Sequence, residues 1–213
     1  MVQNKHSGPR GRGRPRAYDP DEALQQATDK FWRSGFSSTS LDELSAATGM
    51  NRPSLYAAFG DKHALYLKAL ASYWQLSLTA LRKASTDGDQ TLDKALMRAY
   101  EGQLALYFSG DALPRGCFAV GTATTEAVDN PVIRSILADG LRALDADFEA
   151  RFRMARERGE LKDDADPAAL AALASAVLHS IAIRARTGTP RAELTEIARR
   201  AVAIICGASA DAV

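Results

Sequence analysis

Apolar residues recur along this chain at intervals of three and four residues, which is the spacing of one face of an α-helix. Leu24, Ala27 and Phe31 follow this spacing in one segment, and Leu55 and Phe59 follow it in another. Sustained alternation of apolar and polar residues, which would indicate strands, is not found in the sequence, and neither is an internal repeat. The pattern therefore predicts an all-α protein.

Capping residues mark the ends of the first two expected helices. The first helix should begin near Asp19 and Pro20, because aspartate is a good N-cap and proline fits the first turn. It should end at Gly35, where glycine supplies the left-handed conformation of a helix C-terminus. Ser40 and Glu43 have the spacing of a capping box, which predicts a second helix directly after them.

A third helix and a longer fourth one follow. Gly49 allows a sharp turn after the second helix, and Asn51 is placed to cap the third. Gly60-Asp61 then closes the third helix and caps the fourth, which runs to about residue 84. Breaks rich in glycine and proline predict further helices near residues 91–109, 117–128, 131–158, 167–187 and 190–206. We expect a three-helix head (18–64), a disordered arm before it (1–17), and a larger helical body (65–213) joined by the fourth helix.

The second and third helices, with the glycine turn between them, have the form of a helix-turn-helix DNA reader. Arg52 can make a bidentate contact to guanine or bind a phosphate, and the Tyr56 hydroxyl can donate a hydrogen bond to phosphate. The N-termini of the second and fourth helices offer backbone N–H groups to phosphates. The DNA-contacting residues expected in the head are Thr39, Ser40, Asn51, Arg52, Pro53, Ser54, Tyr56 and Lys62.

Charge supports DNA binding through its distribution rather than its total. The formal net charge is only +1, but residues 1–16 hold five basic side chains and no acidic one. We include the arm residues Arg10, Arg12, Arg14 and Arg16 among the DNA contacts. They could lie along a narrow A·T-rich minor groove, or they could add only general attraction to phosphate.

These motifs resemble those of the TetR family of bacterial regulators over about residues 18–70. The resemblance rests on Leu-x-x-Leu-x-x-x-x-Gly at 41–49 and on Ser-Leu-Tyr-x-x-Phe-x-x-Lys-x-x-Leu at 54–65. The segment from Arg115 to Pro131 is similar to the body domain of a subgroup. Thr48 stands where members often have alanine, and Ala57 stands where they often have histidine or an aromatic residue.

The resemblance implies a homodimer whose N-terminal domain binds a palindromic operator in double-stranded DNA. Residues 65–213 would then bind a small-molecule effector and form the dimer. Two amphipathic helices are the candidates for the interface. The alternative is an intrachain core, because periodicity does not distinguish a core from an interface. The candidate residues on these helices are Leu170, Leu173, Ala174, Val177, Leu178, Ile181, Leu194, Ile197, Ala201, Ile204 and Ile205.

The effector pocket is harder to identify from the sequence, since inward-facing aromatic residues more often belong to the ordinary core than to a pocket. The candidates are Trp74, Tyr100, Gln103, Leu104, Tyr107, Phe108, Cys117, Phe118, Thr124 and His179. Cys117 also suggests a redox or electrophile sensor, because a helix N-terminus beside Arg115 would lower the pKa of its thiol. The alternative is that Cys117 is a small buried apolar residue.

The remaining composition excludes several classes. His6, His63 and His179 have no ligand spacing with the two cysteines, so we expect no metal and no cofactor. Two distant cysteines and no secretory signal favour the cytoplasm, and no segment suits a membrane span. We predict a ligand-responsive transcriptional regulator, more specifically a repressor. The alternatives are an architectural protein that uses the arginine arm on A·T-rich DNA and an enzyme with an active site in the helical body.

Overall fold

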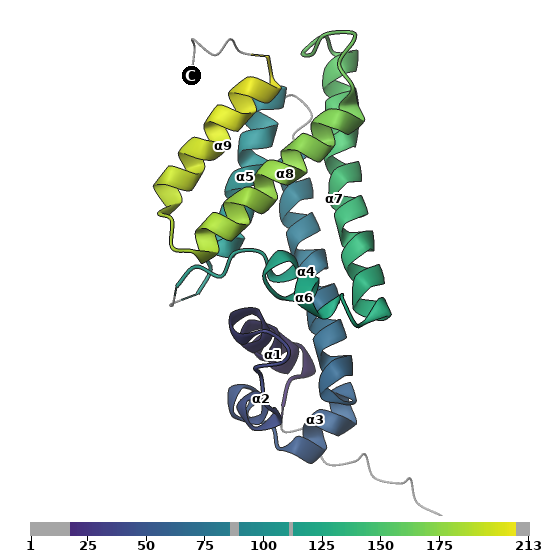
Figure 1. The fold of residues 1–213 in the computed structure, drawn as a ribbon, viewed down its shortest axis with the longest axis vertical. Coiled ribbons are helices and arrows are strands. Elements are labelled where there is room, and N and C mark those ends of the chain that lie inside the picture. The colour runs from purple at the N-terminus through teal and green to yellow at the C-terminus, as the bar shows by residue number, and fades with distance from the viewer. Residues whose placement is uncertain (1–17, 86–89, 111–112, 208–213) are drawn as a thin grey trace, which may run out of the picture.

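The computed structural model describes residues 18–85, 90–110 and 113–207, and all regular structure in these ranges is helical (Figure 1). The all-α prediction is confirmed. The predicted disordered arm, with Arg10, Arg12, Arg14 and Arg16, lies outside the described residues.

Three short helices form the head: α1 (Pro20–Ser34), α2 (Leu41–Thr48) and α3 (Arg52–Phe59). Each begins at the predicted cap. The Asp19 carboxylate accepts a hydrogen bond from a backbone N–H of the first turn of α1, and Asn51 does the same for α3. Ser40 and Glu43 form the predicted capping box of α2. Local capping chemistry therefore sets where these helices start.

Helix α4 (Lys62–Ser85) runs from the head into the body, as Figure 1 shows. The side chain of Asp61 accepts a hydrogen bond from the Ala64 N–H at 2.7 Å, which caps α4 as predicted. Along its length α4 packs against α1 in the head and against α5 and α7 in the body. One continuous helix thus belongs to both parts of the molecule.

The body contains α5 (Leu92–Tyr107), α7 (Pro131–Glu157), α8 (Pro167–Arg186) and α9 (Arg191–Ile205), close to the predicted ranges. The expected helix at 117–128 is different. It consists of a π-helical segment, η1 (Ala119–Ala123), followed by the three-residue α6 (Thr124–Glu126). The hydroxyls of Thr122 and Thr124 donate to carbonyls four residues earlier, and such side-chain bonds compete with regular helical bonding.

Aromatic side chains join the core of the head to the core of the body. Phe31 packs edge-on against Tyr66, and Trp32 packs against Tyr73 and Phe118. All five are almost fully buried. On α2, Ala47 is exposed while the neighbouring Thr48 is buried. Thr48 satisfies its hydroxyl by donating to the Leu44 carbonyl.

Helix α8 is notable for its apolar composition. By length and mean hydropathy (1.6) it is the one described helix that could cross a membrane, contrary to the expectation that no segment would pass such a test. In this structure its buried face, which includes Ala174, Leu178 and Ile181, packs against α7 and α9. This packing buries one side of α8, while Leu173 and Ile183 stay exposed on its outer side.

Candidate nucleic-acid interface and its links to the body

The first turn of α3 lies at the surface of the head, at the end of the molecule away from α9 (Figure 1). Leu55 and Phe59 are buried and hold α3 in place, so the opposite face turns outward. Tyr56 is 48% exposed on that face. Asn51 is also exposed, but its side-chain oxygen accepts the Ser54 N–H at 2.9 Å. The sequence prediction of an outward-facing recognition turn is therefore met.

Arg52 is the basic residue of this turn. Its side chain is 53% exposed and forms an ion pair with Asp42 of α2, with Nη2 at 2.6 Å from Oδ2. Its Nε also donates to Oδ1 of Asp42 at 2.9 Å. Sequence reasoning identified Arg52 but missed Asp42, because a separation of ten residues across a turn gives no local signal.

Two further predicted contacts flank α3. Ser40 is exposed at the N-terminus of α2 and exchanges hydrogen bonds with Glu43, which also pairs with Lys30 at 2.7 Å. The bond from Lys30 and those from Ser40 lower the pKa of Glu43 to about 2. Lys62 is half-buried at the start of α4, where its ammonium group lies 4.4 Å from the ring centroid of Phe36.

Thr39 does not lie where the sequence prediction put it. Only 1% of the residue is exposed, and its hydroxyl donates to the Gly35 carbonyl at 2.6 Å. This bond closes the loop between α1 and α2. The placement of Thr39 among surface DNA contacts is therefore corrected: its side chain stabilises the loop that precedes α2.

Comparison with known proteins identifies this arrangement. A model of "Bacterial regulatory proteins, tetR family" matches residues 23–69, and "Tetracyclin repressor-like, C-terminal domain" matches residues 94–202, just over half the chain. The chain belongs to the TetR family. It is a DNA-binding transcriptional regulator, as the sequence predicted, and the members of this family are regulators rather than enzymes.

Individual relatives of this TetR-family chain agree with the assignment. The HTH-type transcriptional repressor ComR of Escherichia coli (strain K12) is 29% identical over 89% of this chain and 90% of its own. BdcR of the same organism, also an HTH-type transcriptional repressor, is 42% identical over 73 residues, which are 34% of this chain and 36% of BdcR. Among solved structures, a cysteine mutant of CifR in complex with 26-bp operator DNA is 34% identical, with a TM-score of 0.75, and the match covers 89% of this chain and 98% of that one.

Hydrogen bonds join the head of this TetR-family chain to its body. The Trp32 indole N–H donates to the Gly116 carbonyl at 3.0 Å. Arg186, in the last turn of α8, donates to the carbonyls of Trp32 and Arg115 at 3.2 and 3.1 Å. The guanidinium of Arg115 is stacked 4.2 Å from the Trp32 ring centroid and pairs with Asp29 of α1. Sequence patterns could not reveal these links, since each joins residues more than 70 positions apart.

A groove of about 920 Å³ opens beside these links, between α1, α4 and the end of α5. Asp29, Trp32 and Arg115 line it together with apolar side chains that include Leu76 and Leu106. None of the effector residues predicted from the sequence lines this groove.

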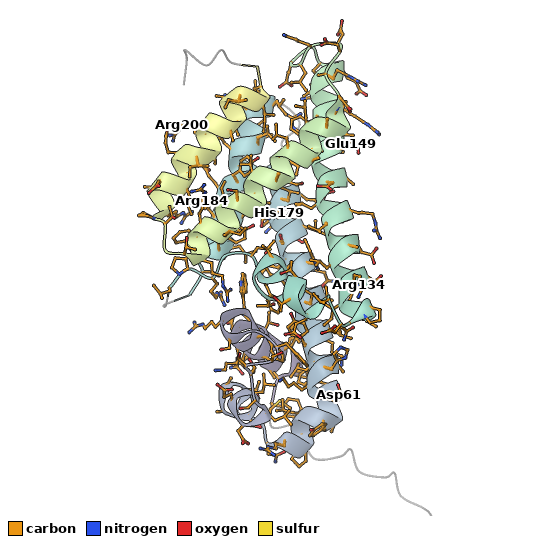
Figure 2. All side chains as sticks on the ribbon, viewed as in Figure 1. Asp61, Arg134, Glu149, His179, Arg184 and Arg200 are labelled. Atoms are coloured by element: carbon orange, nitrogen blue, oxygen red, sulfur yellow. The ribbon has the colours of Figure 1, made fainter. Side chains whose placement is uncertain are left out.

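Most of the predicted effector residues are instead packed in the body core. Trp74, Tyr100, Gln103, Leu104, Tyr107, Cys117 and Phe118 are buried, while Phe108 and His179 are half-buried. The Ser77 hydroxyl donates to the Gln103 side-chain oxygen, and the Gln103 side-chain NH2 donates to the Ser77 carbonyl. The Trp74 ring packs directly against Gly140. His179 lies on α8, well above the head (Figure 2), and burial lowers its pKa. Thr124 is exposed, so its expected inward orientation is corrected.

Cys117 lies in an environment different from the one expected. Its thiol accepts a hydrogen bond from the Tyr73 hydroxyl at 3.0 Å, and the Arg115 guanidinium is directed to Asp29 instead. Burial raises the pKa of Cys117 despite hydrogen bonds from Tyr73 and from backbone N–H groups at the start of η1. A raised thiol pKa argues against an activated sensor thiolate and supports the alternative of a small buried residue.

The predicted interface residues divide into two groups. Ala174, Leu178, Ile181, Leu194 and Ile205 are buried within the chain's own core, so they are corrected to intrachain packing. Leu173 and Ile204 are exposed, and Leu170, Val177, Ile197 and Ala201 are half-buried. The exposed and half-buried residues leave apolar side chains outward on α8 and α9. The same two helices carry Arg184 and Arg200, which Figure 2 labels.

Proposed function

We propose that this TetR-family chain is a repressor that binds a palindromic operator as a homodimer and is released by a small-molecule effector. The observation that carries the proposal is the exposed first turn of α3, with Arg52 and Tyr56 outward and Leu55 and Phe59 anchored inside. A rigid helix with an exposed N-terminal turn fits the major groove of DNA. The relatives ComR and BdcR are named as repressors, which supports repression rather than activation.

The dimer is proposed from α8 and α9. Leu173 and Ile183 are 46% and 54% exposed on α8, and Ile204 is 62% exposed on α9. Ala169, Ala176 and Ser180 lie between these large residues on the outward side of α8, and small residues permit close helix packing. A two-fold axis through this face would present two copies of α3 about 34–36 Å apart, one turn of DNA.

Effector release is proposed to act through the contacts between head and body. The groove beside Trp32, Asp29 and Arg115 has the volume of a small-molecule site, and its lining includes members of the links. A ligand that fits only a displaced α1 would shift the population away from the DNA-binding form. We place this activity in the cytoplasm, where bacterial DNA lies.

Footprinting on genomic fragments, beginning with the DNA upstream of the chain's own gene, tests the proposal. We expect a two-fold symmetric footprint that Arg52→Ala abolishes. Arg142→Ala is the matched control, because Arg142 is also an exposed arginine paired with an aspartate, but on α7. Protection that lacks symmetry and survives Arg52→Ala would contradict the proposal and favour an architectural protein that binds through the arm.

A further inference from the structure

The ion pair between Asp42 and Arg52 joins the two helices of the helix-turn-helix. Both side chains are largely exposed, 75% for Asp42 and 53% for Arg52. An exposed pair of this kind contributes little to folding stability, because water screens the charges. Its geometry, however, is specific: one carboxylate oxygen accepts from Nε and the other lies against Nη2.

This geometry divides the donors of Arg52 between two tasks. A guanidinium group has a side edge formed by Nε and Nη2 and an end edge formed by Nη1 and Nη2. Asp42 occupies the side edge, which leaves the N–H groups of the end edge free. Two parallel N–H donors match the O6 and N7 acceptors that guanine presents in the major groove.

The neighbours of Arg52 in the first turn of α3 are less suited to reading a base. The Asn51 side-chain oxygen is used to cap the helix, Pro53 has no polar side-chain group, and Ser54 is half-buried. Arg52 is thus the residue of this turn that can offer two parallel N–H donors to a base. The carboxylate beside it also disfavours a simple phosphate contact, because Asp42 and phosphate repel each other.

We propose that Asp42 determines specificity by holding Arg52 so that its end edge contacts one guanine in each half of the operator. Asp42 is a positioning residue and does not itself touch DNA. The inference rests on the proposed function, because it requires α3 to lie in the major groove. It adds a defined base and a defined partner residue to that function.

Affinity measurements on the footprinted operator test this inference. Each guanine of a half-site is replaced in turn by 7-deazaguanine, which lacks the N7 acceptor, and its symmetry mate is replaced with it. We expect one position at which wild-type protein loses about tenfold in affinity. In Asp42→Asn the fold-loss of affinity at that position should be less than half of the wild-type value. The amide has only one acceptor oxygen and so keeps at most one of the two contacts to Arg52.

Asp139→Asn is the matched control, since it also removes an exposed carboxylate paired with an arginine, on α7 in the body. It should behave like wild type at every position. Equal losses for Asp42→Asn and wild type at each guanine would overturn the inference, and so would a wild-type protein that tolerates every replacement. A wild-type protein that protects no fragment at all would instead refute the proposed function on which the inference rests.

Discussion

Gly116 shows how one residue constrains the contact between head and body. Its φ of +63° lies in the left-handed region, and its carbonyl accepts the Trp32 indole N–H. A Cβ at this position would lie 2.4 Å from the Ala182 carbonyl oxygen of α8. Both the backbone conformation and the close approach of α8 therefore require glycine.

Replacement of Gly116 by alanine should cost far more stability than the same change at Gly159. Gly159 also has a positive φ, +71°, but a Cβ there would meet nothing within 4 Å. We expect Gly159→Ala to lose about 1 kcal/mol from backbone strain and Gly116→Ala about 3 kcal/mol or more from strain and clash together. Urea unfolding measures both variants, and equal losses would show that α8 does not constrain Gly116.

At the scale of elements, the start of α2 depends on a charged cap. Glu43 accepts hydrogen bonds from the Ser40 N–H and hydroxyl and also pairs with Lys30 of α1. These contacts lower the pKa of Glu43 from 4.5 to about 2 in the folded state. Because the folded pKa is the lower one, the ionised cap stabilises the protein above pH 4.5, and this contribution is lost as the pH falls towards 2.

Glu43→Gln should expose this dependence on pH. Glutamine keeps the shape of the capping box but has no charge to lose. We expect wild type to be the more stable protein at pH 5–7 and the difference to shrink steadily between pH 4.5 and 2. Denaturant midpoints measured for both proteins across that range provide the test. A difference that stays constant with pH would mean that the charge of Glu43 does not stabilise the fold.

The sequence predicted the elements well where local chemistry decides them. Asp19, Ser40, Asn51 and Asp61 each act as the expected cap, because a cap needs only neighbours within a few residues. The 117–128 segment was predicted less well, since hydroxyl bonding within the segment and packing against distant aromatic residues shape η1 and α6 together.

The candidate site shows the same division: residues placed by local spacing were predicted, and contacts between distant segments were not. Arg52 and Tyr56 could be found because they fall between apolar residues at helical spacing. Thr39 could not be recognised as buried, because the loop that encloses it depends on how α1 packs on α2. Likewise, the pairing of Arg52 with Asp42 depends on the crossing of α2 and α3, which spacing alone does not define.

At the scale of the whole molecule, the proposed dimer predicts a sharp contrast between exposed apolar residues. Leu173→Glu places a charge on the outward face of α8, and we expect it to yield a folded monomer with greatly weakened operator binding. Val132→Glu is the control, since Val132 is similarly exposed (49% against 46%) but lies at the start of α7. Analytical ultracentrifugation distinguishes the two, and a dimeric Leu173→Glu would contradict the proposed interface.

Helix α4 has a mechanical consequence for the proposed dimer. Its 24 residues span about 36 Å at the rise of an α-helix, with one end beside the reading head and the other inside the body. A tilt of only about 5° over this length displaces the far end by about 3 Å, comparable to the length of a hydrogen bond. In the proposed dimer the displacements of the two symmetry-related subunits would combine, so a slight movement deep in each body would be enough to move both recognition helices out of register with consecutive turns of the double helix.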